Sequence, residues 1–213
     1  MHETTGHILT VFMGFFAIMN PIANTPVFLG LTANDSTAIR KRIAFKALII
    51  TFFLIVAFIL LGKLIFSLFG ITLPAFQITG GILVFMIGLQ MLHGQQSKVH
   101  SPAIAAAGTE NMQGALSIAV TPLAMPILGG PGTIAAAMNF SSGGGMIGML
   151  ITIVAFGLLC LVTYVFFVSG DRLVKLLGDE GLMMVTRLMG LILAVIGTQM
   201  FITGVTGAIK AGS

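Results

Sequence analysis

Long apolar segments fill most of this chain, and each is close to the length that crosses a lipid bilayer. Of the 213 residues, 57% are hydrophobic and only 8% are charged, whereas a soluble domain carries about 25% charged residues. A helix needs about 20 apolar residues to span the hydrocarbon core. The composition therefore predicts an all-α integral membrane protein with a single transmembrane domain over residues 1–213, and it leaves no length for a second domain.

Six segments are long and apolar enough to be transmembrane helices. They are His7–Thr32, Ile43–Leu61, Pro74–Leu92, Gly114–Phe140, Met146–Val168 and Leu188–Val205. A polar stretch, Gln95–Asn111, separates the first three from the last three, and we interpret residues 95–113 as a linker. No basic residue precedes the first apolar run and no small-residue cleavage site follows it, so we interpret this run as a retained span rather than a signal peptide.

The lysines and arginines predict the orientation, because cytoplasmic loops carry an excess of both. If the N-terminus lies outside, the inner side holds Arg40, Lys41, Arg42, Lys46, Lys98, Arg172, Lys175 and Arg187. The outer side then holds only Lys63 and Lys210. We therefore expect a multi-pass membrane protein with both termini outside. The basic residues form no stripe of the kind that binds nucleic acid, so no nucleic-acid partner is expected.

Two of the apolar segments are interrupted by proline and glycine at corresponding places. The first reads MNPIANTPVFLG from Met19 to Gly30, and the second reads VTPLAMPILGGPG from Val120 to Gly132. Proline lacks a backbone N–H, so it leaves the carbonyl four residues earlier without its helical donor. Such breaks survive in a bilayer only where protein or a polar cavity receives the freed groups. Matching breaks in two halves of a chain are typical of a transporter's substrate site.

The two halves resemble each other beyond the breaks. IGLQML (Ile87–Leu92) matches IGTQMF (Ile196–Phe201), and other matches occur in the same order. These are Gly62 with Gly170, Gly70 with Gly178, Gly81 with Gly190, and Pro21 with Pro122. Because each half has three spans, an odd number, the second half enters the membrane upside down. We therefore predict two inverted three-helix repeats, residues 7–94 and 114–206, whose first helices, the first and fourth spans, are broken.

The polar and small residues beside the breaks are the candidate substrate-binding residues. They are Asn20, Asn24, Thr25, Thr121, Gly129, Gly130, Gly132 and Thr133. A half-helix that begins within the membrane presents unpaired N–H groups and the positive end of its dipole, which suit a carboxylate. A half-helix that ends there presents carbonyls, which suit an ammonium group or a cation. Two facing breaks would thus bind a zwitterion without a charged side chain. The alternative is a pair of proline kinks stabilised by packing.

Other polar residues in the spans allow two interpretations. Gln90 and Gln199 are related by the repeat, and they either line the cavity or hydrogen-bond helices together. Gln77, Thr79 and Asn139 lie near predicted span ends and are interpreted as helix caps. No Asp or Glu lies within a predicted span, which argues against a simple carboxylate proton relay. No metal-ligand spacing and no catalytic motif is present, so we expect no metal, no organic cofactor and no enzymatic activity.

These motifs resemble those of the MarC family, also described as a small neutral amino acid transporter family. The resemblance rests on Asn20–Leu29 (NPIANTPVFL), Pro122–Pro126 (PLAMP), Gly129–Ile134 (GGPGTI) and Arg187–Leu193 (RLMGLIL), and it covers essentially the whole chain. It implies six spans and a place in a prokaryotic cell membrane, the inner membrane where there are two. For members with an assigned activity it implies uptake of glycine and alanine driven by an ion gradient. Relatives often carry Asp where this chain has Asn20, so a titratable group of the family is missing here.

The sequence thus predicts a secondary transporter for a glycine- or alanine-like zwitterion, bound between the two broken helices near the membrane midplane. The resemblance supplies the substrate class, and H⁺ or Na⁺ is the candidate coupling cation. The alternatives are a narrow channel or exporter for small polar or amphiphilic solutes, and a membrane scaffold that transports nothing. The lipid bilayer is an expected partner, and a homo-oligomer stays open.

Overall fold

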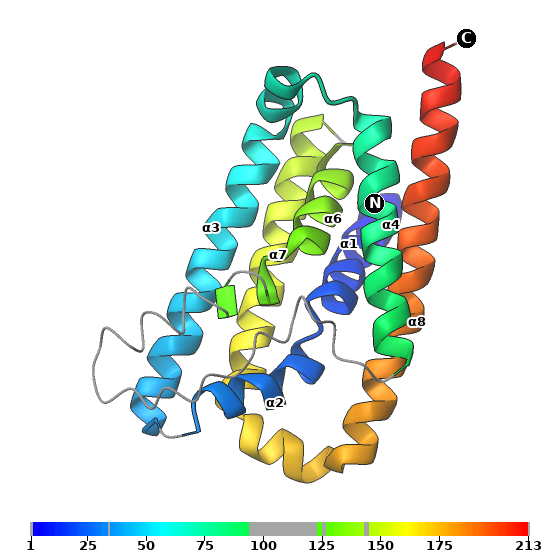
Figure 1. The fold of residues 1–213 in the computed structure, drawn as a ribbon. Helices are drawn as coiled ribbons and strands as arrows, with labels where there is room; N and C mark the ends of the chain where they lie inside the picture. Colours follow the sequence, from blue (N-terminus) through cyan, green and yellow to red (C-terminus); the bar gives the residue numbers. More distant parts are fainter. Residues whose placement is uncertain (1, 34, 94–122, 125–126, 143–144, 213) are drawn as a thin grey trace.

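In this computed structural model, residues 2–33, 35–93, 123–124, 127–142 and 145–212 are described, and they contain helices and no strand. The helices are α1 (His2–Met19), α2 (Pro21–Leu31), α3 (Thr37–Phe69), α4 (Leu73–Leu92), α6 (Pro131–Ser142), α7 (Gly145–Val168) and α8 (Gly170–Gly212). They pack side by side in one bundle, with α1, α2 and α6 inside it (Figure 1). The all-α prediction is confirmed for this part of the chain.

Five stretches of the described residues are long and apolar enough to cross a membrane. They are Ile8–Leu31, Thr37–Gly62, Leu73–Leu92, Gly145–Val168 and Glu180–Ala211. The predicted third and fifth spans agree with these to within one residue at each end. Most of the predicted fourth span, Gly114–Phe140, lies outside the described residues, and its described part contains the 12-residue helix α6. The chain is therefore an integral membrane helical protein.

The second and sixth predicted spans are too short. Helix α3 begins at Thr37, six residues before the predicted start, because Ser36 caps it by accepting a hydrogen bond from the Ile39 N–H. The sixth span belongs to α8, which is 43 residues long and changes direction at Gly178. Gly178 has φ +63°, and Gly70, where α3 ends, has the same φ. Both positions require the left-handed conformation, which glycine adopts without steric cost.

Glycines allow α4 and α8 to run antiparallel at very close range. A Cβ built on Gly81 would lie 2.6 Å from the carbonyl oxygen of Gly197, and one on Gly88 would lie 2.7 Å from that of Gly190. A Cβ on Gly204 would lie 2.8 Å from the carbonyl oxygen of Pro74. Helix association in lipid depends on close van der Waals packing rather than on the hydrophobic effect. This glycine contact is therefore a principal joint of the bundle.

The short helices α2 and α6 fill the interior between the longer ones. Helix α2 packs against α7 and α8, and α6 packs against α1, α3, α4 and α7. Gly170 at the start of α8 leaves room for α2, since a Cβ there would lie 2.8 Å from Cγ2 of Thr25. Aromatic rings fill much of the core, including the stacked pair Phe28 and Phe167, whose centroids are 4.5 Å apart.

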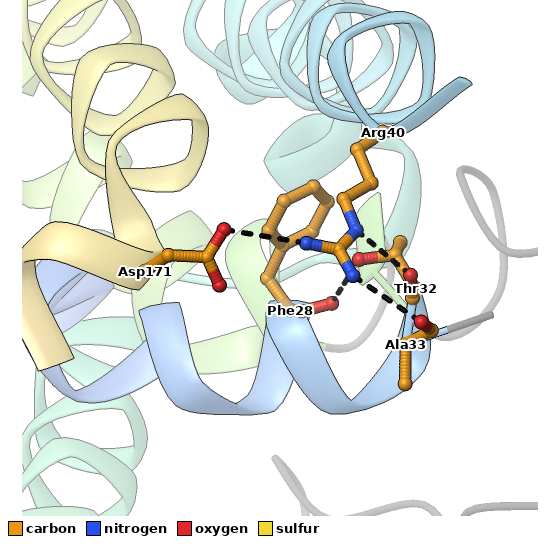
Figure 2. Close-up of polar contacts among 5 residues, drawn as sticks. All are labelled: Phe28, Thr32, Ala33, Arg40 and Asp171. Atoms are coloured by element: carbon orange, nitrogen blue, oxygen red, sulfur yellow. Dashed lines mark hydrogen bonds and ion pairs between the residues drawn. The ribbon is translucent and has the colours of Figure 1, made fainter. Parts of the chain in front are cut away.

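Arg40 fixes the end of α2 to the start of α3 (Figure 2). Its Nε donates to the Thr32 carbonyl at 2.9 Å and its Nη2 to the Ala33 carbonyl at 3.2 Å. Its Nη1 lies 3.5 Å from Oδ2 of Asp171 at the start of α8. The hydroxyl of Thr32 donates to the Phe28 carbonyl at 2.8 Å. One guanidinium thus caps a helix C-terminus and joins α3 to α8 at the same end of the bundle.

Replacing Arg40 with glutamine should lower the free energy of unfolding by about 2 kcal/mol, because its hydrogen bonds are charge-assisted. The Arg40 side chain is 24% exposed, whereas that of Asp171 is 70% exposed. Asp171→Asn should therefore cost less than about 1 kcal/mol, as exposed ion pairs do. Unfolding of both variants in detergent micelles measures the difference. Equal losses would show that the ion pair, and not the carbonyl cap, carries the effect.

Candidate functional site

The first break lies at one residue, Asn20, between α1 and α2. Asn20 has φ +38° and ψ +71°, and it is the only residue other than glycine with a positive φ in the described part of the chain. The residue before a proline is disfavoured in the α-helical region, and asparagine tolerates the left-handed one. The Oδ1 of Asn20 accepts a hydrogen bond from the Ala23 N–H at 3.2 Å, so Asn20 caps α2. Pro21 then starts the helix at the position where proline is best tolerated.

The amide nitrogen of Asn20 has no hydrogen-bond partner among the described residues, although the residue is only 2% exposed. A buried donor without a partner costs about 1–3 kcal/mol. Such a group in a folded protein calls for an explanation, and an unfilled ligand site is one. Asn20 Nδ2 is therefore the strongest candidate donor at the first break.

Neighbouring side chains satisfy carbonyls around this break. The Nδ2 of Asn24 donates to the Met19 carbonyl at 2.6 Å, and the hydroxyl of Thr25 donates to the Pro21 carbonyl at 2.7 Å. Both side chains are buried. The carbonyls of Met19 and Pro21 are thus occupied by local donors. Pro26 does not end the helix as the sequence suggested; it lies inside α2 and leaves the Ile22 carbonyl without its helical donor.

The second break has the same backbone pattern. The Ile134 N–H donates to the Gly130 carbonyl at 3.0 Å, as the Asn24 N–H does to the Asn20 carbonyl at the first break. Pro131 starts α6 as Pro21 starts α2. The hydroxyl of Thr133 donates back to the Leu128 carbonyl at 2.9 Å. Pro131 thus stands at the start of its half-helix as Pro21 does, and Pro122, the predicted match of Pro21, lies outside the described residues.

Both half-helices begin near the middle of the bundle and run toward opposite ends, α2 toward the start of α3 and α6 toward the start of α7 (Figure 1). The first N–H groups of a helix have no intrahelical acceptor. The positive ends of both helix dipoles therefore lie in the interior of the protein. This arrangement attracts an anionic group such as a carboxylate.

A cavity of about 380 Å³ opens beside the second break, between α4 and α6. Its lining is formed by Phe76, Thr79, Gly80, Leu83, Gly129, Pro131, Ile134 and Ala135. Gly80 brings α4 close to α6, since a Cβ there would lie 2.9 Å from Cβ of Ala135. The volume is in the lower range of small-molecule sites. The walls are apolar apart from backbone groups and Thr79. Thr79, Leu83 and Pro131 are exposed, so the cavity opens to the outside of the bundle beside the break.

The structure gathers the predicted binding residues into two groups. Asn20, Asn24 and Thr25 lie at the first break, and Gly129, Gly130, Gly132 and Thr133 lie at the second, all of them buried. Thr121 lies outside the described residues. Gln90 and Gln199 lie on α4 and α8, outside the lining of the cavity; Gln199 is exposed, and Oε1 of Gln90 is buried without a partner in the described structure.

Several polar contacts between the halves were missed at the sequence level. The Nε2 of Gln77 donates to Oδ1 of Asn139 at 2.7 Å, so these residues join α4 to α6 and are not simple end caps. The hydroxyl of Thr163 on α7 lies 3.5 Å from the sulfur of Met19 at the first break. The hydroxyl of Thr51 on α3 lies 3.5 Å from the Ala124 carbonyl ahead of the second break. A lone threonine in an apolar run was the available signal for Thr51 and Thr163.

The described residues contain no group of three or more His, Cys, Asp or Glu side chains that could hold a metal ion. The chemistry at the breaks is hydrogen bonding by backbone N–H groups and neutral amides and hydroxyls. Such groups bind and orient a polar solute.

Comparison with known proteins places the chain in a family. The model of the "MarC family integral membrane protein" matches residues 5–209. This chain belongs to the MarC family. The UPF0056 membrane protein YvbG of Bacillus subtilis (strain 168) is 39% identical to it over 94% of each chain. The UPF0056 inner membrane protein MarC of Escherichia coli (strain UTI89 / UPEC) is 32% identical over 91% of each.

Membership extends across distant bacteria at nearly full length. A UPF0056 membrane protein of Aquifex aeolicus (strain VF5) is 32% identical over 99% of this chain and 97% of its own. No solved structure matches this one. The MarC family assignment confirms the resemblance seen in the motifs, and it makes this chain a multi-pass integral membrane protein.

Proposed function

We propose that this MarC family protein is a secondary transporter of small neutral amino acids of the glycine and alanine class. The observation that carries the proposal is the pair of half-helices whose N-termini lie in the interior, the first of them capped by Asn20, whose amide nitrogen is unpaired in the described structure. Backbone N–H groups and Asn20 Nδ2 would bind the carboxylate of the substrate. The Ile22 carbonyl, which Pro26 deprives of its helical donor, would accept from the ammonium group.

Small size follows from the packing around the breaks. A Cβ on Gly129 would lie 3.0 Å from Leu54 and 3.1 Å from the Ala124 carbonyl, and one on Gly132 would lie 3.1 Å from Ile87. Side chains crowd both glycines, so a substrate with a bulky side chain would not fit beside them. Glycine and alanine are the amino acids that such a site accommodates.

The proposal includes an architecture of six spans in two inverted repeats. The α4–α8 contact supports it. Gly81 and Gly190 are related by an offset of 109 residues, and so are Gly88 and Gly197. Gly81 packs on Gly197, which is the repeat partner of Gly88. Gly88 packs on Gly190, which is the repeat partner of Gly81. A pseudo-two-fold axis between the halves produces this reciprocal pattern, as a two-fold axis does in a symmetric dimer.

In this proposal the repeats rock against each other to open the site to either side in turn. The protein acts as a carrier in the prokaryotic inner membrane, with both termini outside, and catalyses no reaction. A gradient of H⁺ or Na⁺ drives uptake. Since no carboxylate lies at either break, the coupling cation would bind to carbonyl and hydroxyl oxygens.

The test is uptake of radiolabelled glycine into proteoliposomes. Uptake should saturate with glycine concentration, and unlabelled alanine should compete while leucine and glutamate do not. Collapse of the H⁺ and Na⁺ gradients in turn identifies the coupling cation. Flux that rises linearly with concentration would indicate a channel instead. Absence of both uptake and any thermal shift with amino acids would reject the transporter proposal.

A further inference from the structure

An apolar groove of about 600 Å³ runs between α3 and α7 on the outside of the bundle. We call it the α3–α7 groove, and its lining includes Phe45, Ile49, Phe52, Val154, Leu158 and Tyr164. Several of these side chains are well exposed, among them Phe45 at 58% and Val154 at 57%. The groove lies apart from the two helix breaks, and the proposed transport mechanism does not use it.

The groove has a defined direction because α3 and α7 run antiparallel. The ring of Phe45 meets that of Tyr164 edge to face at a centroid distance of 6.4 Å. Farther along, a Cβ on Gly157 would lie 3.3 Å from the ring of Phe52. The Phe45–Tyr164 end is therefore the end nearest to the start of α3, and the absence of a side chain at Gly157 deepens the groove.

Basic residues continue the groove beyond this end. Arg42 lies three residues before Phe45 and seven before Ile49, so it shares their face of α3. Lys46 lies three residues before Ile49, on the same side. Arg40 is engaged with Asp171, whereas Lys41, Arg42 and Lys46 make no ion pair in the described structure.

No acidic residue in the first turn of α3 offsets the charge of these cations. Arg42 and Lys46 lie within the first ten residues of this helix. An anionic group bound there would be stabilised by both side chains. The phenolic hydroxyl of Tyr164, at the same end of the groove, adds a donor.

We infer that the α3–α7 groove is a specific binding site for an anionic phospholipid. One acyl chain lies in the groove, and the headgroup phosphate binds Arg42 and Lys46. Basic pockets between transmembrane helices on the cytoplasmic side are suited to acidic headgroups. This site would couple the repeats to the lipid, because α3 belongs to the first half of the chain and α7 to the second.

The probe for this site is phosphatidylglycerol, compared with phosphatidylcholine of the same acyl chains, and native mass spectrometry of the purified protein counts the bound lipids. The wild type should retain one phosphatidylglycerol in preference to phosphatidylcholine. The double variant Arg42→Gln/Lys46→Gln should lose about 30-fold in phosphatidylglycerol affinity, from about fivefold for each basic residue. The matched control is Arg172→Gln/Lys175→Gln, which removes two exposed basic residues of α8. It should keep the preference.

The groove itself is tested with Val154→Trp, an exposed position where the larger ring would fill the groove without disturbing the core. This variant should fold, and it should bind neither phosphatidylglycerol nor phosphatidylcholine in the groove. The inference is overturned if the two lipids bind equally to the wild type, or if the α8 control loses as much as the α3 variant. It is also overturned if Val154→Trp leaves binding unchanged. A lipid-free dimer that Val154→Trp dissociates would assign the groove to a second copy instead.

Discussion

Gly197→Ala should unfold or severely destabilise the protein, although it adds a single methyl group. The new Cβ would lie 2.4 Å from the backbone nitrogen of Phe85 and 2.7 Å from the carbonyl oxygen of Gly81. Both obstacles are backbone atoms of α4, so no side chain can turn away. The two helices must separate, and their contact along several turns is lost. Overpacking in a core costs about 1–3 kcal/mol, and we expect the upper end or more here.

For a chain of this size, about 3 kcal/mol lowers the melting temperature by about 6–12 °C. Circular dichroism of the protein in detergent micelles measures that shift, and size-exclusion chromatography shows whether the fold survives. The matched control is Gly148→Ala, another buried helical glycine. Its Cβ would approach only the Ser141 carbonyl oxygen, at 3.9 Å, which is ordinary contact. If both variants melt at the same temperature, the α4–α8 contact is not the joint that we describe.

The spacing of the glycines explains why this contact is sensitive. Gly81 and Gly88 on α4, and Gly190, Gly197 and Gly204 on α8, recur every seven residues, which is close to two helical turns. They form a straight stripe on each helix. In lipid the apolar side chains gain little by leaving their solvent, so close backbone approach supplies the association energy. Sequence matching found Gly81 and Gly190 as repeat partners but did not show that the two stripes face each other.

The sequence predicted the helices well where apolarity and helix length coincide. The third and fifth spans are examples, because turn and cap residues bound their apolar runs. It failed at α3 and α8, where the helix continues into charged or polar sequence beyond the membrane-spanning part. A hydropathy pattern gives the length of the apolar segment that can lie in lipid. The helix itself ends at a capping residue or at a residue in the left-handed conformation.

The break at Asn20 could be predicted because asparagine before proline disfavours the helical conformation. The hydrogen-bond partners of the residues around the break could not be predicted from the sequence. The second proline of the segment, Pro26, was expected to break the chain as well, but one missing hydrogen bond inside α2 is tolerated. The cap by Arg40 and the Gln77–Asn139 bond depend on residues that only the folded chain brings together. Such long-range pairs cannot be predicted from the local sequence.

At a pH where its carboxyl is ionised, Asn20→Asp should abolish most glycine uptake while it preserves the fold. Uptake should recover where the carboxyl is protonated, because it can then donate a hydrogen bond, as the Asp that relatives often carry at this position would. Aspartate keeps an oxygen that accepts from the Ala23 N–H, and it tolerates the left-handed conformation at φ +38°. It replaces the unpaired Nδ2 donor with a second acceptor, which would face the substrate carboxylate. Loss of a hydrogen bond to a charged group costs about 1.5–3 kcal/mol, so we expect uptake to fall by about tenfold or more. Initial rates in proteoliposomes measure the fall, and melting in micelles checks the fold.

Two companion variants separate binding from structure at this residue. Asn20→Gly retains the backbone conformation but removes both the cap and the donor, so it should lose uptake with a modest loss of stability. Asn20→Ala must also bear the left-handed strain, and it should melt at a lower temperature than Asn20→Gly. Thr152→Val, which removes a buried hydroxyl bonded only within α7, should leave uptake unchanged. Wild-type uptake by Asn20→Asp at every pH would mean that Asn20 shapes the break but does not bind the substrate.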